Sequence, residues 1–519
     1  MGYLTILLII FFFFSALLTF LNENTKMTAM QIVNDMGIGI NLGNNFDCHS
    51  SFEEIKNPDD QITLWGNAII TKETITSIKK NKFKTIRFPV TWKHFIDENN
   101  KVNTEWMSRV KEVVEWIVNA NNMYCILNVY HDGATGNWLH EGIKSKQKFI
   151  SLWSQIAEEF KYFDQHLIFE SMNDIDYLIG YEYDYLTLFT LTQAFINTVR
   201  NSGGNNNYRL LLISGANNDV DLTCSSEYIM PKDPYNIIAI SIHYYIPSQF
   251  CLEFDDNPWT WTDEFGEVHI INSKKNWGDE GDYNNMISKF ETIKKAFIDK
   301  GIPAIITEIG VLTEQQKESE SIREFLYAHL SMSSDYDGIM PCLWDTSKAI
   351  SGNMNFFNRE TGKWYDEKIK DIFRKIARGK YVKPSEYFIN TNSISVTEPD
   401  PDDFFSISIG QLKVVKVIFN AKLSTSEIWN CGFGMASINS NGGWVGESIG
   451  GATGIKGYDG SYTYTFDVSD RDFNNYIQIQ KWWGQQFITM NYLTVIFEES
   501  QIFINYKEYK KALYFYDLL

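Results

Sequence analysis

Short β-branched runs alternate with amphipathic helical stretches between residues 27 and 380, and this alternation constrains the fold more than any other feature. The helical stretches include residues 71–81, 104–121 and 143–160. The expected strands are 37–42, 85–89, 124–129, 167–172, 209–214, 237–243, 304–308 and 338–344. Eight strands that alternate with helices predict a fold of the α/β class, a (β/α)8 TIM barrel.

An open, doubly wound sheet is the alternative fold for the same alternation. Such sheets usually carry a glycine-rich phosphate-binding loop between the first strand and the first helix. The first strand here reads GIGINLG over residues 37–43, which lacks the required spacing into a helix. The barrel is therefore favoured.

The pattern changes after the barrel. Residues 381–403 are polar and contain several prolines, which predicts a linker or an edge segment. From residue 404 to about residue 499, helical periodicity is lost, and alternating stretches such as 411–423 and 461–468 are separated by glycine-rich turns. This pattern predicts an antiparallel β-sandwich. We assign residues 404–519 to one domain.

The N-terminus carries an uncharged apolar run over residues 3–20. We expect residues 1–22 to be a signal peptide. An uncleaved membrane anchor is the alternative, because a run of this length is just able to cross a bilayer. A signal peptide and an anchor would both direct the export of the rest of the chain. We therefore expect a secreted, extracellular protein with no other membrane partner.

Charge and composition narrow the range of partners. The net charge of −19 argues against nucleic acid, which is bound by clustered Lys and Arg. An acidic protein is compatible with a neutral substrate such as a polysaccharide. The aromatic content of 15%, with 15 Trp, is typical of proteins that hold sugar rings on flat aromatic faces, although burial alone explains much of it. We expect a monomer.

The six cysteines lie far apart and show no metal-ligand spacing, so we expect neither a metal nor another cofactor. Cys125 and Cys342 lie in apolar strand-like runs and are expected to be buried thiols. Cys224 and Cys251 follow two successive strands in polar loops, and a disulfide between them is plausible in an exported protein.

Polar side chains gather where the predicted strands end. In a barrel, residues at the C-terminal ends of the strands face the active site. Carboxylates at the ends of the fourth and seventh strands should therefore face each other across the barrel mouth. The residues at these ends are Asn41, Asn44, Arg87, Tyr130, His131, Asp132, Asn173, Asp174, His243, Tyr244, Tyr245, Glu308, Trp344 and Asp345.

Two facing carboxylates suit the hydrolysis of a glycosidic bond with retention. One is the nucleophile and the other is the acid/base, at a separation of about 5–5.5 Å. Any one of these residues could instead be structural, and the argument rests on their joint placement. Arg87 would keep the nucleophile ionised. Tyr245 would donate to the same carboxylate, and Trp344 would give the sugar a flat apolar floor.

Several stretches resemble glycoside hydrolase family 5, also called cellulase family A, and chiefly its endo-β-1,4-glucanase branch. They are GIGINLGNNFD (37–47), WGN (65–67), IKKNKFKTIRFPVTW (78–92), LIFESMND (167–174), SIHYYIPSQF (241–250), PAIITEIG (303–310) and LWD (343–345), in the family's order. The resemblance implies a TIM barrel that acts on β-glucan with Glu308 as nucleophile. It also implies that Arg87, Asn173, His243, Tyr245 and Trp344 form the rest of the site.

Two positions depart from the family's pattern. The family has Glu as acid/base where this chain has Asp174, and His where it has Tyr130, followed by His131. The shorter side chain retracts the carboxyl by about 1.5 Å, and misplacement on the order of 1 Å can lower a rate about a hundredfold. Two hypotheses follow. The chain hydrolyses internal β-1,4 bonds of plant cell-wall β-glucan by double displacement, or it is an impaired relative that binds β-glucan without efficient turnover.

Loop aromatic residues are candidates for stacking on sugar rings, although each could equally pack internally. Together they favour an open groove that binds a polysaccharide chain, which leaves cellulose, mixed-linkage glucan, xyloglucan and mannan as candidate substrates. The aromatic residues are Trp65, Trp138, Trp259 and Trp261 in the barrel region, and Trp429, Trp444, Trp482 and Trp483 in the expected sandwich. The sandwich resembles the carbohydrate-binding modules that follow related barrels.

Overall fold

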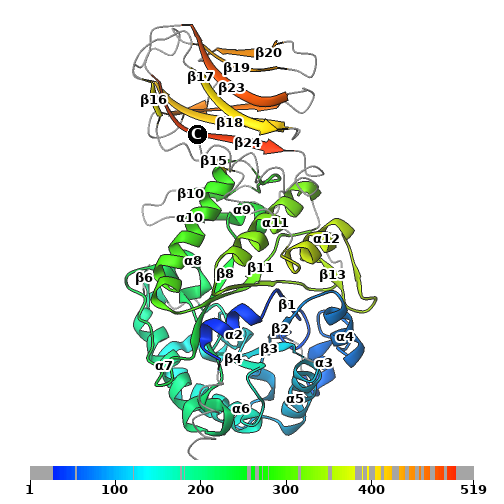
Figure 1. Ribbon diagram of the computed structural model, residues 1–519. Coiled ribbons are helices and arrows are strands. Elements are labelled where there is room, and N and C mark those ends of the chain that lie inside the picture. Colours follow the sequence, from blue (N-terminus) through cyan, green and yellow to red (C-terminus); the bar gives the residue numbers. More distant parts are fainter. Residues whose placement is uncertain are drawn as a thin grey trace, which may run out of the picture. The chain divides into compact units, whose positions relative to one another are not determined.

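The structure is a computed structural model (Figure 1). It describes residues 27–52, 55–120, 122–175, 178–179, 182–253, 259–262, 268–271, 273–278, 280–313, 317–348 and 354–379, and the strands between 388 and 497. Only the backbone is described for 178–179, 182, 259–262, 268–271, 280 and the strands beyond 380. The chain divides into two compact units, residues 1–379 and 380–519.

Eight parallel strands close into a barrel in the first unit, as predicted. The barrel closes where β1 pairs with both β2 and β12, so that Gly39 lies between Thr85 and Cys342. The strands are β1 (Gly39–Asn41), β2 (Thr85–Phe88), β3 (Tyr124–Asn128), β4 (Leu167–Glu170), β7 (Leu211–Ser214), β8 (Ile238–Tyr244), β11 (Ala304–Ile309) and β12 (Ile339–Leu343).

Helices surround the strands (Figure 1). The regularly spaced apolar residues that predicted these helices form the face that each helix buries. In α5 the buried residues include Trp106, Val110, Val113 and Ile117. The side chain of Asn103 caps the first turn of this helix. The helices are α2 (Ala29–Asp35), α3 (Pro58–Ile62), α4 (Lys72–Lys80), α5 (Thr104–Val118), α6 (Lys146–Phe160), α7 (Tyr185–Asn201), α8 (Val220–Cys224), α9 (Ser248–Cys251), α10 (Glu280–Ala296), α11 (Ser319–Asp335) and α12 (Glu367–Ile376).

The short helix α2 contributes to the apolar core and was not predicted. Its Ile32 and Val33 belong to one buried cluster with Ile126 of β3, Ile168 of β4 and Ile305 of β11. At about 25 cal/mol for each Å² of apolar surface removed from water, this burial stabilises the barrel.

Three antiparallel pairs of short strands lie outside the barrel sheet. They are β5 (Leu178–Ile179) with β6 (Glu182–Tyr183), β9 (Trp259–Thr262) with β10 (Val268–Ile271), and β13 (Phe357–Asn358) with β14 (Lys363–Trp364). Residues 1–22 lie outside the described part of the chain. No helix among the described residues has the length and apolarity needed to cross a bilayer.

The suggested disulfide between Cys224 and Cys251 is wrong, because both residues are free thiols. Each is the last residue of its own short helix, α8 or α9, rather than part of an open polar loop. Cys251 is buried, and burial raises the pKa of its thiol. Cys125 and Cys342 are buried free thiols, as predicted.

The second unit contains antiparallel strands in two sheets. Two of its strands, β15 and β16, fall within residues 381–403 and pair with β24. The six-stranded sheet contains β15 (Phe388–Ile389), β16 (Ile394–Val396), β18 (Val414–Leu423), β21 (Ile455–Lys456), β22 (Ser461–Asp467) and β24 (Ile488–Phe497). The four-stranded sheet contains β17 (Phe404–Gly410), β19 (Gly432–Ile438), β20 (Trp444–Gly450) and β23 (Asn474–Trp483).

Candidate active site

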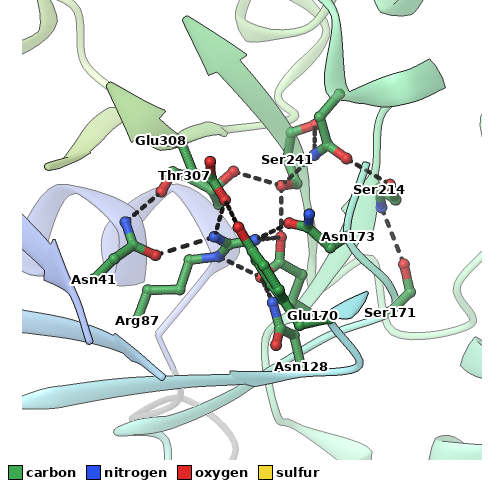
Figure 2. Close-up of polar contacts among 12 residues, drawn as sticks. Asn41, Arg87, Asn128, Glu170, Ser171, Asn173, Ser214, Ser241, Thr307 and Glu308 are labelled. Carbon is green, nitrogen blue, oxygen red and sulfur yellow. Dashed lines mark hydrogen bonds and ion pairs between the residues drawn. The ribbon is translucent and has the colours of Figure 1, made fainter. Parts of the chain in front are cut away.

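Arg87 of β2 lies at the centre of the site, and its side chain is fully buried. Its Nε donates to Glu170 Oε2 at 2.7 Å, and its Nη2 donates to Glu170 Oε1 at 3.0 Å. Its Nη1 donates to Glu308 Oε1 at 2.6 Å and to Asn41 Oδ1 at 3.0 Å. Its Nη2 also donates to Asn173 Oδ1 at 2.6 Å (Figure 2). All five N–H groups of the guanidinium are therefore used.

Glu308 on β11 receives donors on both carboxylate oxygens. Besides Arg87, the Tyr130 hydroxyl donates to Oε1 at 2.8 Å, and the Tyr245 hydroxyl donates to Oε2 at 2.9 Å. Burial alone would raise the pKa of this carboxyl, but His243, Arg87 and the Tyr130 hydroxyl outweigh it and lower the pKa below its ordinary value. Glu308 is therefore held as an ionised carboxylate, as a nucleophile requires.

A second buried carboxylate, Glu170 on β4, was missed by the sequence analysis. Besides the two bonds from Arg87, it accepts from Asn128 Nδ2 at 3.0 Å and from Ser241 Oγ at 2.8 Å (Figure 2). It is fully buried, and these four bonds engage both of its oxygens. Glu170 is therefore a counter-charge for Arg87. The available signal was a lone carboxylate directly after the apolar residues LIF (167–169) of the fourth strand.

Asp174 follows β4 and is exposed to the cleft. It lines a cavity of about 890 Å³ together with His243, Tyr245 and Trp344. The protein around the carboxyl and the charge of Glu308 raise its pKa well above the ordinary value for aspartate. The Asn173 amide donates to Asp174 Oδ1. The two predicted carboxyl groups thus interact electrostatically. Glu308 is favoured in its ionised form and Asp174 in its protonated form, as a nucleophile and an acid/base require.

His243 on β8 has a buried imidazole. Burial lowers its pKa, although the charge of Glu308 opposes this. Its Nε2 lies 3.4 Å from Glu308 Oε1 and, among the described residues, has no hydrogen-bond partner. The residue lines the same cavity as Asp174.

Trp344, directly after β12, stacks against Tyr130. The two ring centroids are 5.7 Å apart and the planes differ by 5°. Gly43 makes room for the indole, because a Cβ at this position would lie 3.0 Å from the Trp344 ring and 2.9 Å from the Asp345 carbonyl oxygen. The tryptophan is half-buried and lines the cavity.

Three aromatic side chains form a cluster beside Tyr130. His131 and Trp65, both predicted to bind substrate, have ring centroids 5.6 Å apart. The sequence analysis missed His49, whose ring centroid lies 4.7 Å from that of His131 and 5.7 Å from that of Trp65. Burial and the neighbouring His131 lower the pKa of His49 to about 4, so its ring is neutral near pH 7.

Trp138, one of the loop tryptophans, has a packing role. Its indole N–H donates to the buried Asp132 Oδ1 at 2.6 Å, and Lys148 Nζ lies 4.8 Å from the centre of its ring. The side chains of Trp259 and Trp261, and the whole of Trp429, lie outside the described residues, as do the other sandwich side chains. Among the described residues, no cluster of three or more His, Cys, Asp or Glu could hold a metal ion.

The loops after β1 and β12 are tied together by Arg359, another residue that the sequence analysis missed. Its Nη1 donates to Asn45 Oδ1 at 2.7 Å, and its Nη2 donates to the Gly43 carbonyl oxygen at 2.5 Å. Asp345 Oδ2 accepts from the backbone N–H groups of Phe356 and Phe357. These bonds fix the loop that carries Trp344.

Comparison with known proteins decides the family. A family model described as cellulase (glycosyl hydrolase family 5) matches residues 43–349. The chain belongs to glycosyl hydrolase family 5. The match lies within the barrel unit, and the resemblance expected from the sequence motifs is confirmed at this level.

Three relatives show how far the similarity extends. A solved GH5-4 broad specificity endoglucanase from an uncultured bovine rumen ciliate is 59% identical, with a TM-score of 0.67; the match covers 69% of this chain and 99% of that one. Endoglucanase A of Paenibacillus barcinonensis is 32% identical over 64% of this chain and 86% of its own length. Endoglucanase A of Clostridium longisporum is 33% identical over 66% of this chain and 65% of its own length.

Proposed function

We propose that this family 5 member is a secreted enzyme that hydrolyses internal β-1,4 bonds of plant cell-wall β-glucan with retention. The observation that carries the proposal is the pair formed by Glu308 and Asp174. Glu308 is held as a carboxylate by Arg87 and two tyrosines, and Asp174 stands in the adjoining cavity with a raised pKa. The endoglucanase names of its relatives support the substrate class.

The reaction proceeds by double displacement. Glu308 attacks the anomeric carbon, while Asp174 protonates the oxygen of the departing chain as the glycosidic bond breaks. Asp174, now ionised, then takes a proton from water, whose oxygen attacks the anomeric carbon and displaces Glu308. The β configuration is restored by the two inversions.

The shorter acid at position 174 sets the main limit on rate. We expect Asp174→Glu to raise turnover of mixed-linkage glucan by about ten- to a hundredfold, because it returns the carboxyl by roughly the 1.5 Å that the missing methylene removed. Turnover of 2,4-dinitrophenyl β-cellobioside, whose leaving group needs no proton, should change far less when cleavage is rate-limiting. The ratio of kcat/KM between Asp174→Glu and the wild type, measured on each of the two substrates, tests this difference.

Asp174→Asn is the matched control for that comparison, since it keeps the length of aspartate but cannot give up or take a proton. It should be slower than the wild type on the glucan. If Asp174→Glu is correctly folded yet no faster than the wild type on either substrate, Asp174 is not the acid/base.

The two perturbed carboxyls also predict the pH dependence. Activity should fall at low pH as Glu308 becomes protonated, and this limb should lie below the ordinary glutamate range because its pKa is lowered. Activity should fall at high pH as Asp174 ionises, and this limb should lie above the ordinary aspartate range because its pKa is raised. A profile of kcat/KM on soluble glucan measures both limbs, and an alkaline limb unchanged in Asp174→Asn would contradict the assignment.

A reducing-sugar assay on soluble mixed-linkage glucan tests the function itself. New reducing ends should appear together with a rapid fall in viscosity, because internal cleavage shortens long chains early. Glu308→Ala serves as the background. Equal signals from the two proteins would favour the impaired, binding-only alternative, which the relatives do not support.

We also propose that residues 404–519 form a β-sandwich that binds carbohydrate. Its antiparallel strands and the adjacent Trp482 and Trp483 at the end of β23 support this proposal, since neighbouring residues on a strand point to opposite faces. Retention of the protein on insoluble glucan, compared with and without residues 380–519, tests it. Equal retention would leave the second unit without a binding role.

A further inference from the structure

We infer that Tyr130 is a positioning residue for Glu308: its hydroxyl occupies Oε1 and thereby leaves Oε2 to attack the sugar. This inference rests on the proposed function, because it assumes that Glu308 is the nucleophile. It gives Tyr130 a role different from the substrate-binding one predicted from the sequence.

The two oxygens of Glu308 are unequally occupied. Oε1 accepts from Arg87 Nη1 at 2.6 Å and from the Tyr130 hydroxyl at 2.8 Å, so both of its lone pairs are engaged. Among the described residues, Oε2 accepts a hydrogen bond from the Tyr245 hydroxyl alone, at 2.9 Å. Tyr245 also lines the cavity. Oε2 therefore keeps a lone pair for the anomeric carbon and is bonded by a side chain that borders the substrate space.

The ring of Tyr130 is held in place by its neighbours, so the hydroxyl is aimed in advance. Trp344 stacks nearly parallel to it, and His131 meets it edge-on with centroids 4.5 Å apart. The Arg87 guanidinium carbon lies 5.4 Å from its centre. Only 5% of the residue is exposed. A side chain packed in this way is poorly placed to turn toward a substrate and well placed to orient a carboxylate.

The phenol keeps its proton throughout the reaction. Burial and the charge of Glu308 raise the pKa of the Tyr130 hydroxyl well above its ordinary value. It can therefore act only as a donor toward Glu308. The resemblance to the family predicts histidine at position 130. A histidine ring has no hydroxyl, so it cannot donate to Glu308 Oε1 as the Tyr130 hydroxyl does.

The contact has a different effect on the two steps of the reaction. In the first step, an electron pair of Oε2 forms the bond to the anomeric carbon, and the pair of the breaking glycosidic bond leaves with the departing oxygen. In the second step, water attacks the anomeric carbon, and the pair of the C–Oε2 bond returns to the carboxylate. A donor on Oε1 stabilises that returning charge. Tyr130 should therefore make Glu308 a better leaving group in the second step.

A trapping experiment makes the first step of the reaction independent of Asp174. 2,4-Dinitrophenyl 2-deoxy-2-fluoro-β-cellobioside has a leaving group that departs without a proton, and its fluorine slows the release of the sugar from the enzyme. The rate of covalent labelling against pH reports the ionisation of Glu308. The rate of release with cellobiose as acceptor reports the second step. Peptide mass spectrometry locates the label.

Tyr130→Phe keeps the packed ring and removes only the hydroxyl. We expect the acid limb of labelling to move to higher pH and release to slow by about tenfold, since a hydrogen bond to a charged group is lost. Tyr130→His, which places the family's residue at this position, should shift both readouts in the same direction.

Tyr124→Phe is the matched control, because Tyr124 begins β3, the strand that precedes Tyr130, and its hydroxyl donates to Asp35 Oδ2, also at 2.8 Å. It should label and release like the wild type. The inference is overturned if the wild type labels at Glu308 while Tyr130→Phe and Tyr130→His keep its pH limb and release rate. A wild type that forms no label, or labels another residue, overturns the proposed function as well.

Discussion

Replacing Glu308 by glutamine should lower β-glucan turnover by at least about a thousandfold, because the attacking carboxylate is lost while every other group stays in place. Glutamine has nearly the same shape as glutamate. Its oxygen can accept from Arg87 and Tyr130 as Oε1 does now, while its amide can donate to the Tyr245 oxygen. The loss should therefore come from chemistry rather than from unfolding. Initial rates on soluble glucan measure it.

Glu105→Gln on α5 is a suitable control, since this residue is exposed and lies in the helix that precedes β3. It should keep wild-type activity. A Glu308→Gln variant that retains a tenth or more of wild-type turnover would remove Glu308 as the nucleophile. Binding of cello-oligosaccharides by the same variant shows whether the cleft remains intact.

Replacing Arg87 by methionine should destabilise the barrel by about 3–5 kcal/mol and also abolish activity. The change leaves Glu170 and Glu308 buried without a cation, and an uncompensated buried charge is costly. It also removes five hydrogen bonds that join β1, β2, β4 and β11. Amide hydrogen exchange in peptides that cover β2 and β11 measures the free energy of opening in the barrel itself.

Two controls separate this effect from the loss of any arginine. Arg109→Met breaks a partly exposed ion pair with Glu112 and should change the opening free energy by less than about 1 kcal/mol. Adding Glu170→Gln to Arg87→Met removes one of the two buried carboxylates that lack a cation. The double variant should therefore recover part of the lost opening free energy. Unchanged exchange in Arg87→Met would show that the buried charges are not held by this guanidinium.

Much of the barrel could be predicted because its signals are local. The strand expected at 124–129 is observed at Tyr124–Asn128, and the helix expected at 71–81 is observed at Lys72–Lys80. Alternation of strand and helix then restricts the topology to few choices. Helix α2 was missed because it is only 7 residues long, which gives too little periodicity to recognise.

The site was predicted in its members but not in its contacts. Arg87 and Glu308 are 221 residues apart, so the pattern of strand ends indicates that they meet without showing which atoms pair. Glu170 was overlooked because the expected strand ran to residue 172, whereas β4 ends at Glu170 itself. Tyr130 was assigned to the substrate because its bond to Glu308 depends on the packing of Trp344, and no spacing in the sequence reveals that packing.

Proton NMR during the first minutes of cello-oligosaccharide hydrolysis tests the central claim most directly. If Glu308 forms a covalent bond with the sugar and Asp174 assists both steps, the new reducing end must appear first as the β-anomer, and the α-anomer must follow only by mutarotation. Initial appearance of the α-anomer would contradict double displacement, and the absence of any new reducing end would contradict hydrolysis itself.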